Sequence, residues 1–206
     1  MKRLPIMLKL EGKTAAVVGA GKVAARHIPK LLSAGIKEVM VYSPSLDQSL
    51  AGYHDHSQII WIKGEISERH SFDTDLLLLT STNHELHQRL LEQRKPGQLI
   101  YLADDPVASD IHFPITITRG ELSVALSTNG SSPTYAKQLK EKIEECLTDE
   151  IEGDLIFLDK VRRQVQEAVS EPSQRKQLLR QATSEKVLRN KDRDTLMKQM
   201  IDDVIH

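Results

Sequence analysis

The stretch TAAVVGAGKVA, residues Thr14–Ala24, decides the fold of this chain. An apolar strand pattern runs directly into the turn Gly19-Ala20-Gly21, and a helical pattern of apolar residues follows. This order is typical of the phosphate-binding turn of a dinucleotide-binding fold, with alanine in place of the third glycine. The helix N-terminus behind such a turn attracts the pyrophosphate through its free N–H groups. The residues expected to contact the dinucleotide here are Gly19, Ala20, Gly21, Lys22 and Val23.

The composition bounds the class of protein. The chain has 206 residues, of which 39% are hydrophobic and 4% aromatic, so its core must be aliphatic. The net charge of −1 gives no support for nucleic-acid binding. No apolar run approaches the roughly 18 residues that span a membrane, and the start of the chain does not predict a signal peptide. Cys146 is the only cysteine, which excludes an internal disulfide and suits a reducing cytoplasm.

Residues 1–112 alternate between strand and helix patterns. Such alternation predicts an α/β domain with a parallel, doubly wound sheet of the Rossmann type. The expected strands are Thr14–Val18, Glu38–Tyr42, Ile59–Ile62, Leu76–Leu79 and Leu99–Ala103, and the expected helices are Val23–Ala34 and His84–Arg94. The last four strands are short apolar runs, which predicts that they are covered on both faces.

A small α+β unit is expected next, over residues 113–147. Phe113–Thr118 and Leu122–Ser127 predict a hairpin with its turn at Arg119-Gly120. The polar loop Ser127–Pro133 then leads into a helix, because Ser132 is a favourable N-cap and proline suits the first helical position. We expect this unit to link the first domain to the rest and to take part in dimerisation.

Residues 148–206 read as a charged helical domain. Apolar residues recur at helical spacing between Leu155 and Val169, Pro172 interrupts the pattern, and a second apolar group lies between Leu196 and Ile205. So short a segment is expected to be too small to bury a core of its own comfortably. We therefore expect it to pack on the first domain or on a second subunit.

Ligands of an open parallel sheet bind beyond the carboxyl ends of its strands, so the residues that follow the strands are candidates. Ser43-Pro44 follows the second strand, where an NAD-binding fold usually has an acidic residue for the ribose. No arginine follows closely for a 2′-phosphate, which leaves NAD ahead of NADP. Thr80-Ser81 follows the fourth strand, where small side chains let a cofactor pass closely; Asn83 can at the same time cap the next helix.

Asp104-Asp105 follows the fifth strand. A half-buried carboxylate near another carboxylate would have a raised proton affinity, which suits acid–base work near neutral pH. The alternative is a turn or helix cap, because aspartate before proline is common in turns.

The histidines give weaker evidence for a functional site. His84 and His87 lie three residues apart on an expected helix, and His54 and His56 lie in a polar loop. Each pair has the side chains for a metal, but no carboxylate-rich third element accompanies either, so we expect no metal site. For His112, just beyond the fifth-strand loop, a structural role is favoured.

Several motifs together resemble one known family. Leu4-Pro5-Ile6, Leu10–Lys13 and Val17–Arg26 resemble the opening of the precorrin-2 dehydrogenase module of siroheme synthases. The likeness continues, in the correct order, at Thr80–Asn83, Ala103–Pro106, Phe113-Pro114 and Val124–Pro133. It covers about residues 3–145, and several motifs in register are far more specific than one glycine turn.

The resemblance implies an activity and a set of residues. The family oxidises precorrin-2, a tetrapyrrole, to sirohydrochlorin with NAD⁺, and some members also insert ferrous iron to give siroheme. The resemblance implies that Asp104 is the acid–base residue, that NAD lies against the glycine turn and Ser43-Pro44, and that the protein is a homodimer. The Ser127–Pro133 loop resembles the family's segment that faces the tetrapyrrole, which implies substrate contacts by Ser127, Thr128, Asn129, Gly130 and Ser131. Asp105 and His112 are added as substrate-side candidates because they lie near Asp104 in the chain, although the family usually has an apolar residue at the position of His112.

Two alternatives stay open. One is a bifunctional enzyme that also inserts iron or cobalt, because metal insertion could use the same carboxylate. The other is a nucleotide-sensing module without turnover, but such modules usually carry an acidic residue after the second strand and need no aspartate pair. A short-chain dehydrogenase is disfavoured, because no tyrosine is followed four positions later by lysine.

Overall fold

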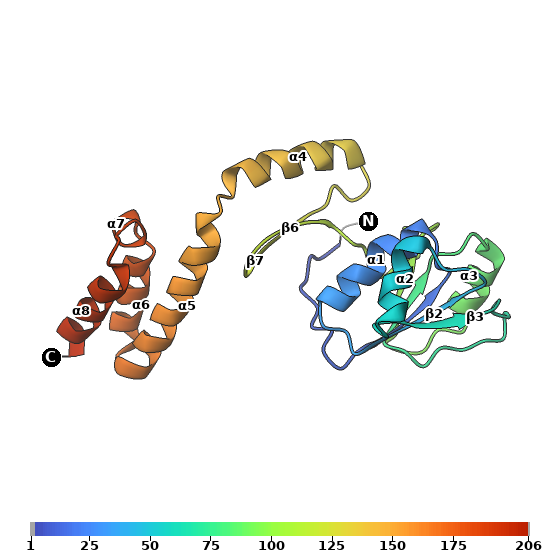
Figure 1. Ribbon diagram of the computed structural model, residues 1–206, viewed down its shortest axis with the longest axis horizontal. Helices are drawn as coiled ribbons and strands as arrows, with labels where there is room; N and C mark the ends of the chain where they lie inside the picture. The colour runs from blue at the N-terminus through green and yellow to red at the C-terminus, as the bar shows by residue number, and fades with distance from the viewer. Residues whose placement is uncertain (1–2, 206) are drawn as a thin grey trace. The chain divides into compact units, whose positions relative to one another are not determined.

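The computed structural model describes residues 3–205, which form two compact units that divide between Phe113 and Pro114 (Figure 1). We call them unit 1 and unit 2. The expected α/β class with a small antiparallel sheet and C-terminal helices is confirmed. The finer division into three parts, with a boundary near residue 147, stays a prediction.

Unit 1 is a five-stranded parallel sheet in the order β3-β2-β1-β4-β5. Its strands are β1 (Thr14–Val18), β2 (Glu38–Ser43), β3 (Ile60–Lys63), β4 (Leu76–Leu79) and β5 (Leu99–Leu102). Its helices are α1 (Lys22–Ser33), α2 (Gln48–Asp55) and α3 (His84–Glu92). Because all strands run the same way, their carboxyl ends meet at one edge of the sheet. Helix α2, which Asp47 caps through its side chain, was not predicted from the sequence.

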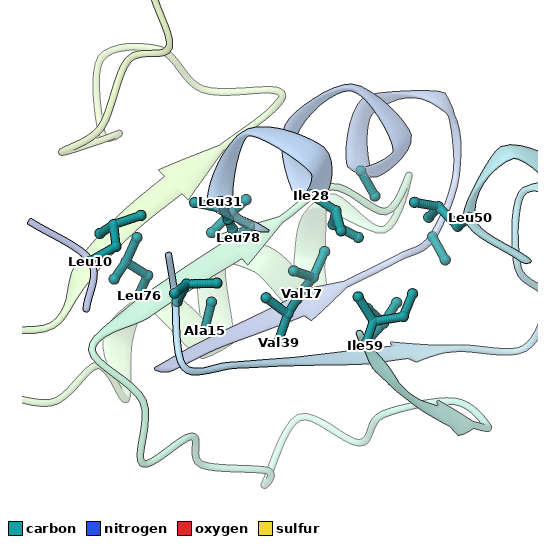
Figure 2. Close-up of a cluster of buried hydrophobic side chains, with 14 residues drawn as sticks. Leu10, Ala15, Val17, Ile28, Leu31, Val39, Leu50, Ile59, Leu76 and Leu78 are labelled. Atoms are coloured by element: carbon teal, nitrogen blue, oxygen red, sulfur yellow. The ribbon is translucent and has the colours of Figure 1, made fainter. Parts of the chain in front are cut away.

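The sheet is covered on two faces by different helices, as a doubly wound fold requires. Alternate strand residues such as Val17 and Val39 pack with Ile28 of α1 and Leu50 of α2 in one core (Figure 2). The other alternate residues of β1, β4 and β5 pack with α3 in a second core, which contains Leu90. The short apolar runs of β1 and β4 are therefore buried on both sides.

Strand β3 differs from the expectation. Its Ile60 and Ile62 are 47% and 39% exposed, so it is not covered on both faces. The reason is its place at the sheet edge, where it pairs only with β2. The run of apolar residues cannot reveal this, because hydrophobicity does not report strand order.

Helix α1 carries a buried histidine, His27, which packs against Tyr101 and Phe113. His27 stacks on Phe113 with ring centroids 4.2 Å apart, and its Nε2 lies 3.2 Å from the Tyr101 hydroxyl. Its Nδ1 is buried without a hydrogen-bond partner among the described residues. Burial, helped by the nearby charges of Lys30 and Arg26, lowers the pKa of His27 to about 4.

This depressed pKa predicts acid sensitivity. The unfolded chain takes up a proton on His27 near pH 6.5, whereas the folded protein does so only near pH 4. The unfolded state therefore binds more protons between these values, and the free energy of unfolding should fall as the pH drops through this window. Urea unfolding at a series of pH values measures the slope. In the variant His27→Gln, the free energy of unfolding should change less steeply with pH, whereas the exposed control His56→Gln should keep the slope of the parent. Equal slopes for both variants would contradict the assignment of this pH dependence to His27.

Unit 2 begins with an antiparallel hairpin, β6 (Ile115–Arg119) and β7 (Leu122–Leu126). Arg119 pairs with Leu122, so the turn is formed by Gly120-Glu121, one residue later than expected. Helix α4 (Pro133–Cys146) follows, and the Ser132 hydroxyl accepts the Tyr135 N–H at 3.2 Å, which confirms the predicted cap.

The helices α5 (Glu150–Ala168), α6 (Pro172–Ala182), α7 (Glu185–Leu188) and α8 (Arg193–Ile205) enclose a core of their own. Its buried residues are Phe157, Val161, Val165, Val169, Leu178, Ala182, Val187, Met197 and Ile201. The expectation that this segment is too small for such a core is wrong, because the four helices fold back on one another and bury apolar stripes that one extended helix would leave exposed. Among the described residues, no helix combines the length and the apolar character that crossing a bilayer demands.

Candidate active site at the carboxyl edge of the parallel sheet

The glycine turn lies against the end of β4. Gly19 has φ +93°, and a Cβ atom at this position would lie 2.6 Å from the backbone nitrogen of Ser81. Its N–H donates to the carbonyl of Tyr42 at 2.8 Å, and its own carbonyl accepts the Thr80 hydroxyl at 2.8 Å. Gly19 is therefore required both by its backbone conformation and by the close approach of β4.

The N-terminus of α1 is open. Gly21 is its N-cap and supplies no side-chain cap, and its missing Cβ faces open space. The first turn of α1 carries no acidic residue. In contrast, Asp47 and Asn83 cap α2 and α3 through their side chains. The uncapped N–H groups and the dipole of α1 thus favour an anion such as a pyrophosphate.

The residues after β2 are engaged within their own turn. Ser43 is buried, its hydroxyl donates to the Ser45 carbonyl at 2.7 Å, and its oxygen accepts the indole N–H of Trp61 at 3.2 Å. The Asp47 carboxylate accepts hydrogen bonds from the backbone N–H and the hydroxyl group of Ser49. These hydrogen bonds lower the pKa of the Asp47 carboxyl. Pro44 is exposed. The hydroxyl hydrogen of Ser43 is thus already donated within the turn. A ribose contact by Ser43 and Pro44 stays a prediction.

Two histidine side chains converge on Asp104, which follows β5. Its Oδ1 lies 2.9 Å from Nδ1 of His87, and its Oδ2 is hydrogen-bonded to Nδ1 of His84. The other ring nitrogen of His87 lies 2.9 Å from the Ser81 hydroxyl. Ser81, His87 and Asp104 therefore form a continuous hydrogen-bonded chain that starts beside Gly19.

The prediction that no carboxylate-rich element accompanies His84 and His87 is wrong, because Asp104 contacts both. The signal was available: the histidines begin the helix after β4, Asp104 follows β5, and these strands are neighbours in the sheet. Only the pairing of β4 with β5, which the sequence does not state, brings the two loops together.

The proton affinity of Asp104 also differs from the expectation. Burial raises the pKa of the Asp104 carboxyl, but the hydrogen bonds from His84 and His87 outweigh burial and hold it below its usual value. The expected raised pKa is wrong, because the nearest groups are imidazoles rather than a second carboxylate. Asp104 is therefore ionised at neutral pH and is able to accept a proton.

The neighbouring candidates have structural contacts. The Asp105 carboxylate accepts hydrogen bonds from the backbone N–H groups of Val107 and Ala108, at 2.9 and 3.0 Å. Asp105 therefore stabilises the turn after β5, as the alternative interpretation predicted. Nε2 of His112 lies 3.0 Å from the Pro106 carbonyl. A substrate contact by Asp105 or His112 stays a prediction.

The remaining candidates lie in unit 2, in the loop before α4. The Ser127 hydroxyl accepts the Asn129 N–H at 3.1 Å, and Asn129 and Gly130 adopt positive φ angles. Ser131 donates its N–H to the Thr128 carbonyl at 3.0 Å. The loop is thus ordered by its own hydrogen bonds, and its role in substrate binding stays a prediction.

Residues 6–115 match a family model described as putative NAD(P)-binding, and residues 119–145 match one described as the central part of a sirohaem biosynthesis protein. The chain belongs to the putative NAD(P)-binding family. The first match spans the whole sheet of unit 1 and includes the glycine turn, the loop after β4 and Asp104.

Relatives from this family carry the names that the motifs predicted. The chain is 32% identical to a siroheme synthase of Neisseria meningitidis serogroup C, over 75% of this chain and 32% of that protein. It is 30% identical to siroheme synthase 1 of Aeromonas salmonicida, over 86% of this chain and 38% of that protein. The chain thus spans less than two fifths of the length of these relatives. It is 23% identical to a precorrin-2 dehydrogenase of Bacillus subtilis, over 78% of this chain and 98% of that protein.

A solved structure shows the same fold. The chain aligns with SirC, a precorrin-2 dehydrogenase, at a TM-score of 0.83 and 22% identity, over 98% of this chain and 100% of that one. The resemblance predicted from the motifs is therefore confirmed at the level of family and fold.

Proposed function

We propose that this chain oxidises precorrin-2 to sirohydrochlorin with NAD⁺. The observation that carries the proposal is an ionised carboxylate, Asp104, at the edge of the sheet where the glycine turn lies, joined to that turn through His87 and Ser81. The Bacillus relative that the chain covers almost completely bears the name of this activity. A nucleotide-sensing module would need no such carboxylate.

The residues of unit 1 fit a nicotinamide dinucleotide. Gly21 leaves space for a close backbone approach, and the open N-terminus of α1 matches a pyrophosphate. When bound, the nicotinamide accepts a hydride. The choice of NAD rests on Asp47, whose backbone N–H donates to the Ala20 carbonyl and so keeps an ionised carboxylate beside the turn. That charge would repel the 2′-phosphate of NADP.

Asp104 supplies the proton acceptor. Oxidation removes a hydride and a proton from the reduced macrocycle, and loss of the hydride makes the neighbouring proton acidic. The lowered pKa makes Asp104 a weaker base but keeps it ionised at neutral pH. The cation left by loss of the hydride is acidic enough to give up its proton to such a carboxylate. His84 and His87 fix the carboxylate and stabilise its charged form, and most of the remaining work is to position the macrocycle.

The test is an assay of the purified full chain with precorrin-2. We expect sirohydrochlorin to form with NAD⁺, and kcat/KM to be lower with NADP⁺. The variant Asp47→Asn retains a side-chain cap for α2 but removes the negative charge. It should therefore narrow the difference in kcat/KM between NAD⁺ and NADP⁺. No product with either cofactor would overturn the proposed function, and a preference for NADP⁺ would overturn the choice of cofactor.

A second candidate function is metal insertion into the oxidised macrocycle, favoured by the two histidines beside Asp104.

The partners in the proposed oxidation are the tetrapyrrole and a second copy of the chain, and no nucleic acid or membrane is part of it. The homodimer is implied by the resemblance and is open to a sedimentation measurement at micromolar concentration.

A further inference from the structure

We propose that Ser81 is an activated nucleophile that small activated esters acylate, with His87 as its base and Asp104 as the residue that orients this base. The three side chains are joined in a row by two contacts of 2.9 Å, from Ser81 to His87 and from His87 to Asp104. This order of serine, histidine and aspartate recurs in hydrolases of unrelated folds and is recognised by its geometry. The proposal goes beyond the oxidation of precorrin-2 and does not depend on it.

The hydrogen bonds fix the tautomer of His87. An ionised carboxylate only accepts hydrogen bonds, so Nδ1 of His87, which lies 2.9 Å from Oδ1 of Asp104, must carry a proton. In the neutral ring Nε2 then has a free lone pair, and it lies 2.9 Å from the Ser81 hydroxyl. The hydroxyl therefore donates to Nε2, which is the arrangement in which an imidazole removes the proton of a serine.

A second imidazole holds Asp104 for this role. Oδ2 of Asp104 is hydrogen-bonded to Nδ1 of His84, so both carboxylate oxygens are fixed. These hydrogen bonds keep the pKa of the Asp104 carboxyl below its usual value. Within residues 3–205, no lysine or arginine lies within 4.0 Å of the carboxylate to compete for it. Asp104 is thus available to stabilise the imidazolium that forms when His87 takes the serine proton.

Ser81 stands at a turn where a strand leads into a helix. It follows β4 and precedes α3, at the carboxyl edge of the sheet. Ser81 is half-buried, whereas His87 behind it is fully buried, so a substrate reaches the hydroxyl first. Where a serine nucleophile occupies such a turn, the N–H of the next residue stabilises the oxyanion. That N–H belongs here to Thr82, and the residues that the structure describes offer it no hydrogen-bond acceptor.

The reaction needs only an ester and water. The Ser81 oxygen attacks the ester carbonyl carbon, and its proton passes to Nε2 of His87. His87 returns this proton to the leaving alcohol as the C–O bond breaks, which leaves an acyl group on Ser81. Water then attacks the acyl group, again with His87 as base, and releases the carboxylic acid. Nothing is oxidised or reduced, and the side chains return to their starting states.

One consequence rests on the proposed function. A Cβ atom at Gly19 would lie 2.6 Å from the backbone nitrogen of Ser81, so a dinucleotide at the glycine turn would cover the nucleophile. Saturating NAD⁺ should therefore slow acylation of Ser81. A rate that NAD⁺ leaves unchanged would overturn this shared position, whereas reactions without NAD⁺ decide the nucleophile itself.

Reaction of the purified full chain with an alkyl fluorophosphonate tests the nucleophile directly. The Ser81 oxygen would form a bond to phosphorus and displace fluoride, and mass spectrometry of peptides locates the adduct. We expect the adduct at Ser81. With p-nitrophenyl acetate we expect a burst of about one nitrophenolate per chain, followed by slower release. Release should be slow because water reaches the buried His87 only past the acylated Ser81.

Three variants accompany these reactions. Ser81→Ala should lose both the adduct and the burst. Asp104→Asn should slow formation of the adduct by more than about 100-fold, because asparagine does not hold His87 in the required tautomer. The control Ser45→Ala removes an exposed serine after β2 and should react as the parent chain does.

Two results would overturn the proposed nucleophile. One is the absence of an adduct at Ser81 in the parent chain, which needs no variant to fold. The other is an adduct that forms at the parent rate in Asp104→Asn, since the hydrogen-bonded row would then be structural only. Neither reagent requires precorrin-2 or NAD⁺, so both results leave the proposed oxidation standing. Failure of the oxidation assay leaves the test of Ser81 equally valid.

Discussion

The variant Asp104→Asn is expected to oxidise precorrin-2 about 10²–10⁴ times more slowly than the parent chain. Asparagine cannot accept a proton at neutral pH, and its NH₂ group cannot take the place of the carboxylate oxygen that accepts from an imidazole. Binding of NAD⁺ should be unchanged, because Asp104 lies after β5, whereas the glycine turn lies after β1. Steady-state rates with precorrin-2, combined with NAD⁺ titration by fluorescence, measure both effects.

The neighbouring aspartate provides a matched control. Asp105→Asn changes the same side chain one position along, but its Oδ1 can still accept the N–H groups of Val107 and Ala108. We expect this variant to fold as the parent does and to lose far less activity than Asp104→Asn. Parent-like turnover in Asp104→Asn would remove the residue from its assigned role, and equal losses in both variants would point to a disturbed loop.

The variant Gly19→Ala is expected to lose about 2–4 kcal/mol of stability and to bind NAD⁺ poorly. The φ angle of +93° at position 19 is costly for any residue with a Cβ atom. That atom would also lie 2.6 Å from the backbone nitrogen of Ser81. The neighbour is backbone held by β4 and cannot rotate away as a side chain would. Urea unfolding and NAD⁺ titration report the two losses.

Gly21 separates folding from binding at the same turn. Its φ is −87° and a Cβ atom there would meet nothing within 4 Å, so Gly21→Ala should fold with the stability of the parent. The added methyl group would instead occupy the space where a pyrophosphate approaches the backbone. We expect weaker NAD⁺ binding without lower stability. If Gly21→Ala bound NAD⁺ as the parent does, the dinucleotide would not lie against this turn.

Much of the fold was predictable because local sequence patterns carry it. The boundaries of β1 and β4 were predicted correctly, since an apolar run with a turn at its end has few other stable conformations. The Ser132 cap was predictable for the same reason, as a helix start depends on the few residues around it. The exposure of β3 and the separate core of α5–α8 were not predictable, because they depend on strand order and on how helices fold back on one another.

The candidate site divides in the same way. The glycine turn is a local motif whose conformation follows from residues 19–21. The sequence by itself therefore predicted a dinucleotide site after β1 and determined that Asp104 lies at the same sheet edge. Only the tertiary structure decided what surrounds Asp104. Its pKa and its two imidazole contacts arise from the pairing of β4 with β5, which brings His84 and His87 to a residue that is 17 positions or more away in the chain. Electrostatic properties depend on distances across a few ångströms of space, and spacing along the chain does not state those distances.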